Sequence, residues 1–358
     1  MPFLIRCRSL RPSGAPCSRK MVWLRKFVAV FAAFAAPALS QDYKMVGSIP
    51  IGGAGGWDYL AADSQNRRLY VSHGTEVVVI DLDSRKIVGR VPGMKRIHGI
   101  AIANDANVGY ITDGGADQAV VFDLKSLAVK QRVSTGKNPD AVCYDPTSHY
   151  IFTMNGGSQD STVIDARSGE VVKTIPLGGK PEFAASDGKG SVYVNLEDKN
   201  QLARLDVKQM AVSAQWPLGA CDSPSGLAID RQNRRLFSVC DNKIMTVVDA
   251  DSGKVVATPA IGEGPDAAAF DPGNHVALSS NGRSGTLTVV REDSADQFTV
   301  AQTVQTERGA RTMTVDEKSH NIYLVTAKFG PAPPVSPSNP RPRPVIQPDS
   351  FKVLIVGQ

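Results

Sequence analysis

The segment Asp63-Ser-Gln-Asn-Arg-Arg-Leu-Tyr70 decides the fold, because it returns almost unchanged as Asp230-Arg-Gln-Asn-Arg-Arg-Leu-Phe237. These are two of seven copies of one unit, which recurs at a period of roughly 42 residues. Each copy has a small-residue lead-in, an apolar run, an Asp-centred turn, a β-branched run, a Gly/Asn-rich gap and a run that ends in Asp. The turn aspartates are Asp63, Asp145, Asp187, Asp230, Asp271 and Asp316, and the second copy has Ala103-Asn-Asp-Ala instead.

A second marker repeats with the same period. It is the Asp that closes the Val-Ile-Asp run, found at Asp81, Asp123, Asp165, Asp206 and Asp249, with Arg291 in the sixth copy. Two independent markers and four strand-like runs per copy are typical of propeller blades. The sequence therefore predicts an all-β, seven-bladed β-propeller of four-stranded blades. In the fifth copy the expected strands are Ser225–Ile229, Leu236–Cys240, Ile244–Val248 and Lys254–Ala257.

The two ends of the repeat region complement each other. Lys44–Ile51 resembles the fourth strand of an internal copy, and Phe351–Val356 resembles a third strand. We therefore expect the N-terminal strand to complete the last blade and close the ring, which leaves no open edge there. A proline-rich segment, Phe329–Pro348, interrupts this last blade as part of an insertion at 329–350. It is either an exposed insertion or a strap across one face, because proline cannot donate to a strand ladder.

Residues 1–40 read as a leader rather than as part of the fold. Arg25 and Lys26 precede an apolar run of about ten residues, and Ala38 and Ser40 occupy the positions that a signal peptidase reads. We expect cleavage before Gln41 and a periplasmic or secreted protein, with 41–358 as a single domain. The signal peptide covers about 21–40, and Met21 is the expected true start.

The charge of the chain belongs largely to this leader. It holds seven of the 40 basic residues and no acidic residue, so the remainder has 33 basic against 35 acidic residues. A nearly neutral domain does not favour nucleic-acid binding. We expect no membrane span in the mature chain, a monomer, and an unknown small molecule or envelope component as partner.

Cysteine usage fits an exported protein. Cys221 and Cys240 lie in the same copy of the repeat and are expected to form a disulfide, although two separately buried thiols remain the alternative. Cys143 lies in an apolar run and is expected to be buried.

The repeats resemble the YVTN/YncE family of seven-bladed propellers. The residues that carry the resemblance are Arg68-Leu-Tyr-Val71, Ser191-Val-Tyr-Val-Asn195 and Asn321-Ile-Tyr-Leu324, together with the runs Val79-Ile-Asp81, Val163-Ile-Asp165 and Val247-Val-Asp249. The resemblance covers 42–358 and implies a propeller fold and export in bacteria. It implies little about chemistry, because the motifs are structural.

The position that opens the first strand of each copy is the candidate ligand-binding position. Sevenfold pseudo-symmetry places these residues around the channel mouth, where loops from the ends of the second strands add His73, Glu76, Asp113, Asp117 and Asp241. The seven candidate residues are Asp58, His98, Asp140, Glu182, Ser225, Asp266 and Arg311. Four carboxylates against one guanidinium predict a preference for a divalent cation, Ca²⁺ or Mg²⁺, or for a cationic ligand. The alternative is a hydrated polar mouth without a ligand.

Three classes of function remain open. We favour a binding or scaffold protein of the cell envelope with its ligand at the channel mouth. The alternative is a metal-assisted lactonase- or lyase-like enzyme with His98 as general base. A redox or cofactor-binding propeller is the third class, but no haem or copper ligand set is evident. Catalytic residues are not identifiable from the sequence.

The remaining polar residues of the repeat have simpler expected roles. The turn aspartates are expected to bond their own backbone in Asx turns. The Arg pairs that follow them, such as Arg67 and Arg234, are expected to be solvated, as are His149, His275 and His320.

Overall fold

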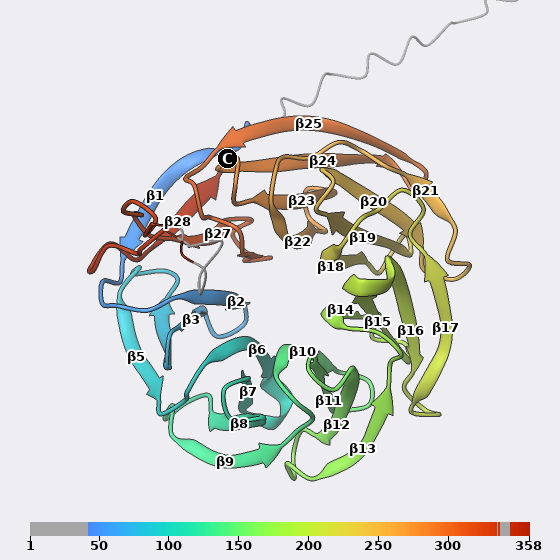
Figure 1. Ribbon diagram of the computed structural model, residues 1–358, viewed down its shortest axis with the longest axis horizontal. Helices are drawn as coiled ribbons and strands as arrows, with labels where there is room; N and C mark the ends of the chain where they lie inside the picture. The colour runs from blue at the N-terminus through green and yellow to red at the C-terminus, as the bar shows by residue number, and fades with distance from the viewer. Residues whose placement is uncertain (1–41, 335, 337–343) are drawn as a thin grey trace, which may run out of the picture. The chain divides into compact units, whose positions relative to one another are not determined.

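The computed structural model describes residues 42–334, 336 and 344–358, so the predicted leader and cleavage site lie outside the described residues. Residues Gln41–Gln358 form one compact unit. Seven four-stranded antiparallel sheets are arranged around a central axis, as Figure 1 shows. The expected all-β, seven-bladed propeller is confirmed.

The first four blades follow the chain in order, with the first strand of each blade innermost. Blade 1 is β2 (Trp57–Asp63), β3 (Arg68–His73), β4 (Glu76–Asp81) and β5 (Ile87–Pro92), and blade 2 is β6 (Ile97–Ala103), β7 (Val108–Asp113), β8 (Gln118–Asp123) and β9 (Val129–Ser134). Blade 3 is β10 (Pro139–Asp145), β11 (Tyr150–Asn155), β12 (Asp160–Asp165) and β13 (Val171–Pro176), and blade 4 is β14 (Pro181–Ser186), β15 (Ser191–Leu196), β16 (Gln201–Asp206) and β17 (Ala211–Pro217).

The last three blades include the closure of the ring. Blade 5 is β18 (Pro224–Asp230), β19 (Arg235–Cys240), β20 (Ile244–Asp249) and β21 (Val255–Ala257), and blade 6 is β22 (Pro265–Asp271), β23 (Val276–Asn281), β24 (Thr286–Ser294) and β25 (Gln297–Gln305). Blade 7 is β26 (Met313–Val315), β27 (Ile322–Thr326), β28 (Lys352–Gly357) and β1 (Lys44–Pro50). Antiparallel pairing of β1 with β28 closes the ring, as the sequence predicts. Two short 3₁₀ turns, Asn104–Ala106 and Glu197–Lys199, complete the described elements.

Apolar side chains of the second and third strands fill the spaces between blades. The Tyr of the repeat is fully buried at Tyr70, Tyr110 and Tyr193, and each of these packs with residues of a neighbouring blade. Such β-branched and aromatic side chains suit strands that are covered on both faces. The core is therefore a series of inter-blade layers, which fixes the geometry of the channel.

The turns after the first strands define one face of the ring, here called the turn face. The turn aspartates are buried and accept backbone N–H groups, as in Asn66 N to Asp63 Oδ1 at 3.0 Å and Ser148 N to Asp145 Oδ2 at 2.9 Å. The expected Asx turns are therefore present at these positions.

The turn arginines are not solvated, and that expectation is wrong. Arg67 is largely buried and donates to both oxygens of Asp316 in blade 7, at 2.8 and 2.7 Å. Arg234 makes the equivalent contact with Asp187 of the preceding blade at 2.9 Å. In both pairs a single guanidinium nitrogen, Nη1, donates to the buried carboxylate, and such a charge-assisted hydrogen bond compensates the carboxylate for its lost hydration. Each pair therefore ties two blades together, and Arg67–Asp316 does so across the point of ring closure.

Two of the three turn histidines also have partners. The Nδ1 atom of His149 lies 2.7 Å from Asp105, and that of His320 lies 2.9 Å from Asp271. His275 is exposed, as expected.

Cys221 and Cys240, the expected pair, form a disulfide with Cα atoms 5.4 Å apart. It fastens the loop before β18 to the end of β19, and Cys143 is a buried free thiol. No helix among the described residues is long and apolar enough to cross a membrane.

Candidate functional site

The face opposite the turns carries the channel mouth. Six of the seven predicted residues lie there at the start of the innermost strands, and Arg311 lies two residues before β26. We call the seven residues the mouth ring: Asp58, His98, Asp140, Glu182, Ser225, Asp266 and Arg311. In blades 1 to 6 the pairing between the first and second strands shifts register at this residue. A bulge bends a strand and redirects one side chain out of the ladder. In these six blades the repeat therefore turns one side chain out of the ladder at the mouth.

Hydroxyl groups from neighbouring strands hold the ring backbone in place. Thr312 Oγ1 donates to the carbonyl of Asp58 at 2.6 Å, while Asp58 N donates to Ser72 Oγ at 2.8 Å. The buried Thr112 hydroxyl donates to the carbonyl of Asp140 in the next blade. Satisfied backbone groups fix the direction of the ring side chains before any ligand arrives.

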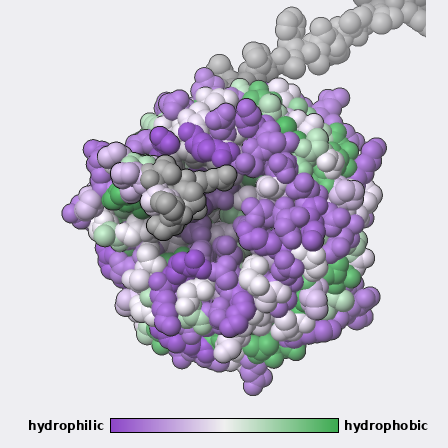
Figure 2. Space-filling view, viewed as in Figure 1, coloured by the Kyte–Doolittle hydropathy of each residue, from purple (hydrophilic) through white to green (hydrophobic). Residues whose placement is uncertain are grey.

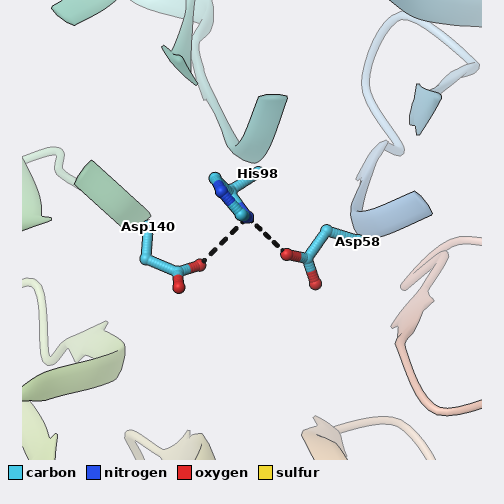
Figure 3. Close-up of side chains that lie close together, drawn as sticks. All are labelled: Asp58, His98 and Asp140. Carbon is cyan, nitrogen blue, oxygen red and sulfur yellow. Dashed lines mark hydrogen bonds and ion pairs between the residues drawn. The ribbon is translucent and has the colours of Figure 1, made fainter. Parts of the chain in front are cut away.

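His98 lies between two carboxylates (Figure 3). Its Nδ1 atom is 2.6 Å from Asp58 Oδ2 and 3.6 Å from Asp140 Oδ1. Burial disfavours the charged imidazole, but the hydrogen bond to Asp58 and the charges of Asp140 and Asp58 outweigh it and raise the pKa of His98. Burial and the charge of Asp58 raise the pKa of Asp140. The other ring nitrogen, His98 Nε2, is buried and has no hydrogen-bond partner among the described residues.

Arg311 extends this group around the ring. It pairs with Asp58 at 3.2 Å and with Asp266 in the neighbouring blade, and it donates to the carbonyl of Trp57 at 3.0 Å. Ser225 Oγ donates to Asp266 Oδ1 at 2.8 Å. Six ring residues from six blades thus form one connected chain of contacts.

Glu182 stands outside that chain and has a cation of its own. Lys180 Nζ contacts Glu182 at 2.7 Å and also contacts Glu197. Burial and the nearby charge of Asp140 raise the pKa of Glu182 to about 7, although Lys180 opposes the shift. Near neutral pH this carboxyl is therefore poised to exchange a proton when the charge at the mouth changes.

Two aromatic rings meet below the mouth ring. Tyr59 of β2 and Phe183 of β14 come from blades on opposite sides of the channel, and their ring centroids are 4.4 Å apart. Burial and the charges of Asp140, Asp58 and Glu182 raise the pKa of Tyr59 well above its usual range, so its hydroxyl stays neutral beside the carboxylates. The aromatic pair bridges the channel next to the mouth ring. We call this pair the aromatic floor, and the ring together with the floor the cup.

The polar loop residues expected around the mouth have structural partners. Asp113 accepts the backbone N–H groups of Lys95 and Arg96, and Asp117 accepts that of Asn138 at 2.8 Å. The other three are also engaged: His73 stacks on Phe351, Glu76 pairs with Arg90, and Asp241 pairs with Arg283. These side chains hold the loops and are not aimed together at a ligand.

The described ends of the proline-rich insertion lie on the mouth face. Gly330 N donates to Val345 O at 2.7 Å, and Phe329 and Pro344 line a cavity together with Asp266 and Arg311. Residues 335 and 337–343, the middle of the expected strap, lie outside the described residues. Figure 2 shows that hydrophilic residues predominate around the centre of the face in view.

One part of the ring has the composition of a metal site. Within the described part of the chain, Asp58, His98 and Asp140 offer ligand atoms that all lie within 4.8 Å of one another. The set combines one imidazole nitrogen with two carboxylate oxygens. Such a mixed set suits Zn²⁺ or Mn²⁺ better than Ca²⁺ or Mg²⁺, which prefer oxygen alone.

The comparisons with known proteins bear on the fold. The chain is similar in structure to Kuenenia stuttgartiensis hydrazine synthase, with a TM-score of 0.65 and 14% sequence identity, covering 75% of this chain and 92% of that chain. At this identity the likeness shows the propeller fold alone. No protein-family model and no curated protein matches the chain. Membership of the YVTN/YncE family therefore stays an expectation.

The sequence interpretation missed three residues of the site: Lys180, Tyr59 and Phe183. A signal for the aromatic pair was present. The residue after each ring position is small or a threonine in five blades, namely Gly99, Ala141, Gly226, Ala267 and Thr312, and aromatic in the other two. Lys180 had no such signal, because its role depends on the 3₁₀ turn that brings Glu197 close.

Proposed function

We propose that this chain is an exported binding protein of the cell envelope, and that its ligand occupies the cup at the channel mouth. The signal-peptide pattern before Gln41 supports export. The disulfide between Cys221 and Cys240 agrees with an oxidising compartment. The cup combines converging polar groups with a neighbouring aromatic pair, a combination that small-ligand sites commonly use.

The observation that carries the proposal is the group of Asp58, His98 and Asp140. We infer that it holds a divalent cation through Asp58 Oδ2, His98 Nδ1 and Asp140 Oδ1. The short contact between Asp58 and His98 currently holds a proton, and a cation would take its place. Protons and the cation therefore compete, and affinity falls as the pH drops through the raised pKa values of His98 and Asp140.

The geometry favours binding over catalysis by His98. A general base needs a free nitrogen within reach of the substrate. Nδ1 is held by Asp58 beside Asp140, and Nε2 is buried. A metal-assisted lactonase or lyase remains the second hypothesis, but it requires a general base other than His98. Glu182, with its pKa raised to about 7, is the candidate at the mouth.

Metal analysis of the purified protein, combined with thermal-shift measurements against Zn²⁺, Mn²⁺, Ca²⁺ and Mg²⁺, tests the proposal. We expect the largest rise in melting temperature with Zn²⁺ or Mn²⁺, and its loss in Asp140→Asn. Asp117→Asn is a matched control, because Asp117 faces the mouth loops but contacts Lys137 and Asn138. If no cation shifts the wild type, the cation site is wrong and the scaffold interpretation remains.

A further inference from the structure

Beside the mouth ring, two adjoining cavities lie between blades 6 and 7 and the described ends of the proline-rich insertion. Their volumes are about 470 and 270 Å³, and they share Gly309, Arg311, Phe329 and Pro344 as lining residues. Volumes of this order are typical of small-molecule sites. The carboxylates of Asp58, Asp140 and Glu182 do not line either cavity.

The polar wall of the larger cavity is basic. Arg283, Arg308 and Arg311 line it, against Asp266 as the acidic member. Asp266 is already neutralised by Arg311, and Arg283 uses one nitrogen to pair with Asp241 at the surface. The guanidinium of Arg308 has no hydrogen-bond or ion-pair partner in the described part of the chain. Unused N–H donors in a concave wall are suited to a carboxylate or a phosphate.

The opposite wall is apolar and aromatic. Phe329 and Pro344 line both cavities, and Trp57 and Ile346 extend the smaller one. The ring centroids of Trp57 and Phe329 are 5.9 Å apart, and Trp57 Nε1 is buried without a hydrogen-bond partner among the described residues. This wall accepts an apolar, preferably aromatic, body.

Glycines make room for these walls. A Cβ at Gly309, where φ is +88°, would lie 2.6 Å from the Phe329 ring, and a Cβ at Gly282 would lie 2.6 Å from Arg311 Cβ. Backbone hydrogen bonds of 2.8 Å run from Gly309 N to Gly282 O and from Gly282 N to Gly264 O. These hydrogen bonds join the glycine backbones of the two blades beneath the cavity. A residue larger than glycine at position 309 or 282 would displace the side chain of Phe329 or Arg311.

From this geometry we propose that the joined cavities bind an organic anion, with its carboxylate or phosphate on Arg308 and Arg283 and an aromatic body against Phe329. The inference extends the proposed function to a second ligand class beside the cation site. It does not depend on the cation, because the groups proposed to hold the anion, Arg308, Arg283 and Phe329, are not cation ligands. Arg311 lies between the two sites, since it lines the cavities and pairs with Asp58.

Calorimetric titration with 2-naphthoate and 2-naphthyl phosphate tests the inference, with 2-naphthylmethylammonium as the isosteric cation and inorganic phosphate as the bare anion. We expect at least one naphthyl anion to bind, the ammonium and bare phosphate to bind at least tenfold more weakly, and Arg308→Gln and Phe329→Ala each to weaken the anion tenfold or more. Arg132→Gln, an exposed arginine of β9 that bonds the Gly93 carbonyl, is the matched control.

Three outcomes would overturn the inference: no binding of either naphthyl anion, equal binding of the ammonium, or wild-type affinity in Arg308→Gln. Asp140→Asn separates the two sites, because it removes cation binding and leaves the anion affinity unchanged. The anion titration can therefore be interpreted even if the protein binds no cation. The cation experiment can likewise be interpreted if no anion binds.

Discussion

Carboxylates line both faces of this propeller, but in different states. On the turn face, Asp316 is fully buried, accepts N–H and O–H groups from its own turn and binds Arg67 with both oxygens. On the mouth face, Asp58 and Asp140 are partly exposed and share one histidine. The turn carboxylates are satisfied by the fold itself, whereas those of the mouth depend on a proton or another cation. The same residue type is thus structural on one face, and on the other it forms the site that we propose for a cation.

The protonation of the two faces shows the same contrast. Burial opposes the charge of Asp316, but hydrogen bonds from Ser319, Ser64 and Arg67 lower its pKa to about 2. At the mouth, burial and like charges raise the pKa of Asp140 and of Glu182. A lowered pKa means that the folded state stabilises the charged carboxylate. A raised pKa means that the folded state destabilises the charged form.

Removal of 42–51 should have the largest effect, because it deletes β1 and opens the edge of β28. We expect aggregation or a loss of cooperative folding, since an unpaired strand edge is a template for association. Light scattering and thermal unfolding measure this. Unchanged solubility and melting temperature would show that closure does not depend on β1, and that the contacts of the turn face suffice.

Arg67→Ala should be the most damaging single substitution on the turn face. It leaves Asp316 buried without its guanidinium, which costs about 3–5 kcal/mol of unfolding free energy. The Asp316 carboxylate contributes stability above its usual pKa of 3.8 and loses it as the pH falls through about 2, so the effect of the substitution should shrink in acid. Urea unfolding checks this. A loss below about 1 kcal/mol, as expected for the exposed control Arg132→Ala, would contradict it.

Glu292 is the exception on the turn face. Its carboxyl oxygens are buried beside Asn233 and Asp230 without a well-formed hydrogen bond to a described residue. Burial together with the charge of Asp230 raises the pKa of Glu292 to about 7, although Asn233 opposes the shift. The folded state then holds a proton that the unfolded state releases above its usual pKa of 4.5, so stability falls between pH 4.5 and about 7.

Glu292→Gln should therefore stabilise the protein at pH 8 by up to about 3 kcal/mol and have little effect at pH 4. Urea unfolding of both proteins across this pH range measures the difference. If the gain in unfolding free energy does not depend on pH, the substitution acts through packing and not through the proton that Glu292 binds.

Asp140→Asn should change stability least, by no more than about 1 kcal/mol, because it relieves repulsion with Asp58 as it removes a partner of His98. Its predicted effect is on cation binding instead. A strong loss of stability would contradict the contrast between the faces, since it would make Asp140 a structural residue like Asp316.

The period and its two markers were enough to predict the blades and the closing strand, because each repeat unit forms the same hairpins. The role of the mouth ring as a ligand site stays a prediction. The pairings between blades were not predictable in the same way. Arg67 and Asp316 are 249 residues apart, and only the closed ring brings them together. Lys180 and the aromatic floor likewise depend on how individual loops and side chains reach across the channel.

The central claim is that the mouth, rather than the turn face, holds a cation between Asp58, His98 and Asp140. Anomalous diffraction from crystals of the protein grown with Mn²⁺ or Zn²⁺ tests it most directly. We predict one strong peak about 2.0–2.2 Å from Asp58 Oδ2, His98 Nδ1 and Asp140 Oδ1. A cup without a peak, or a peak bound only by exposed residues elsewhere, would contradict the claim.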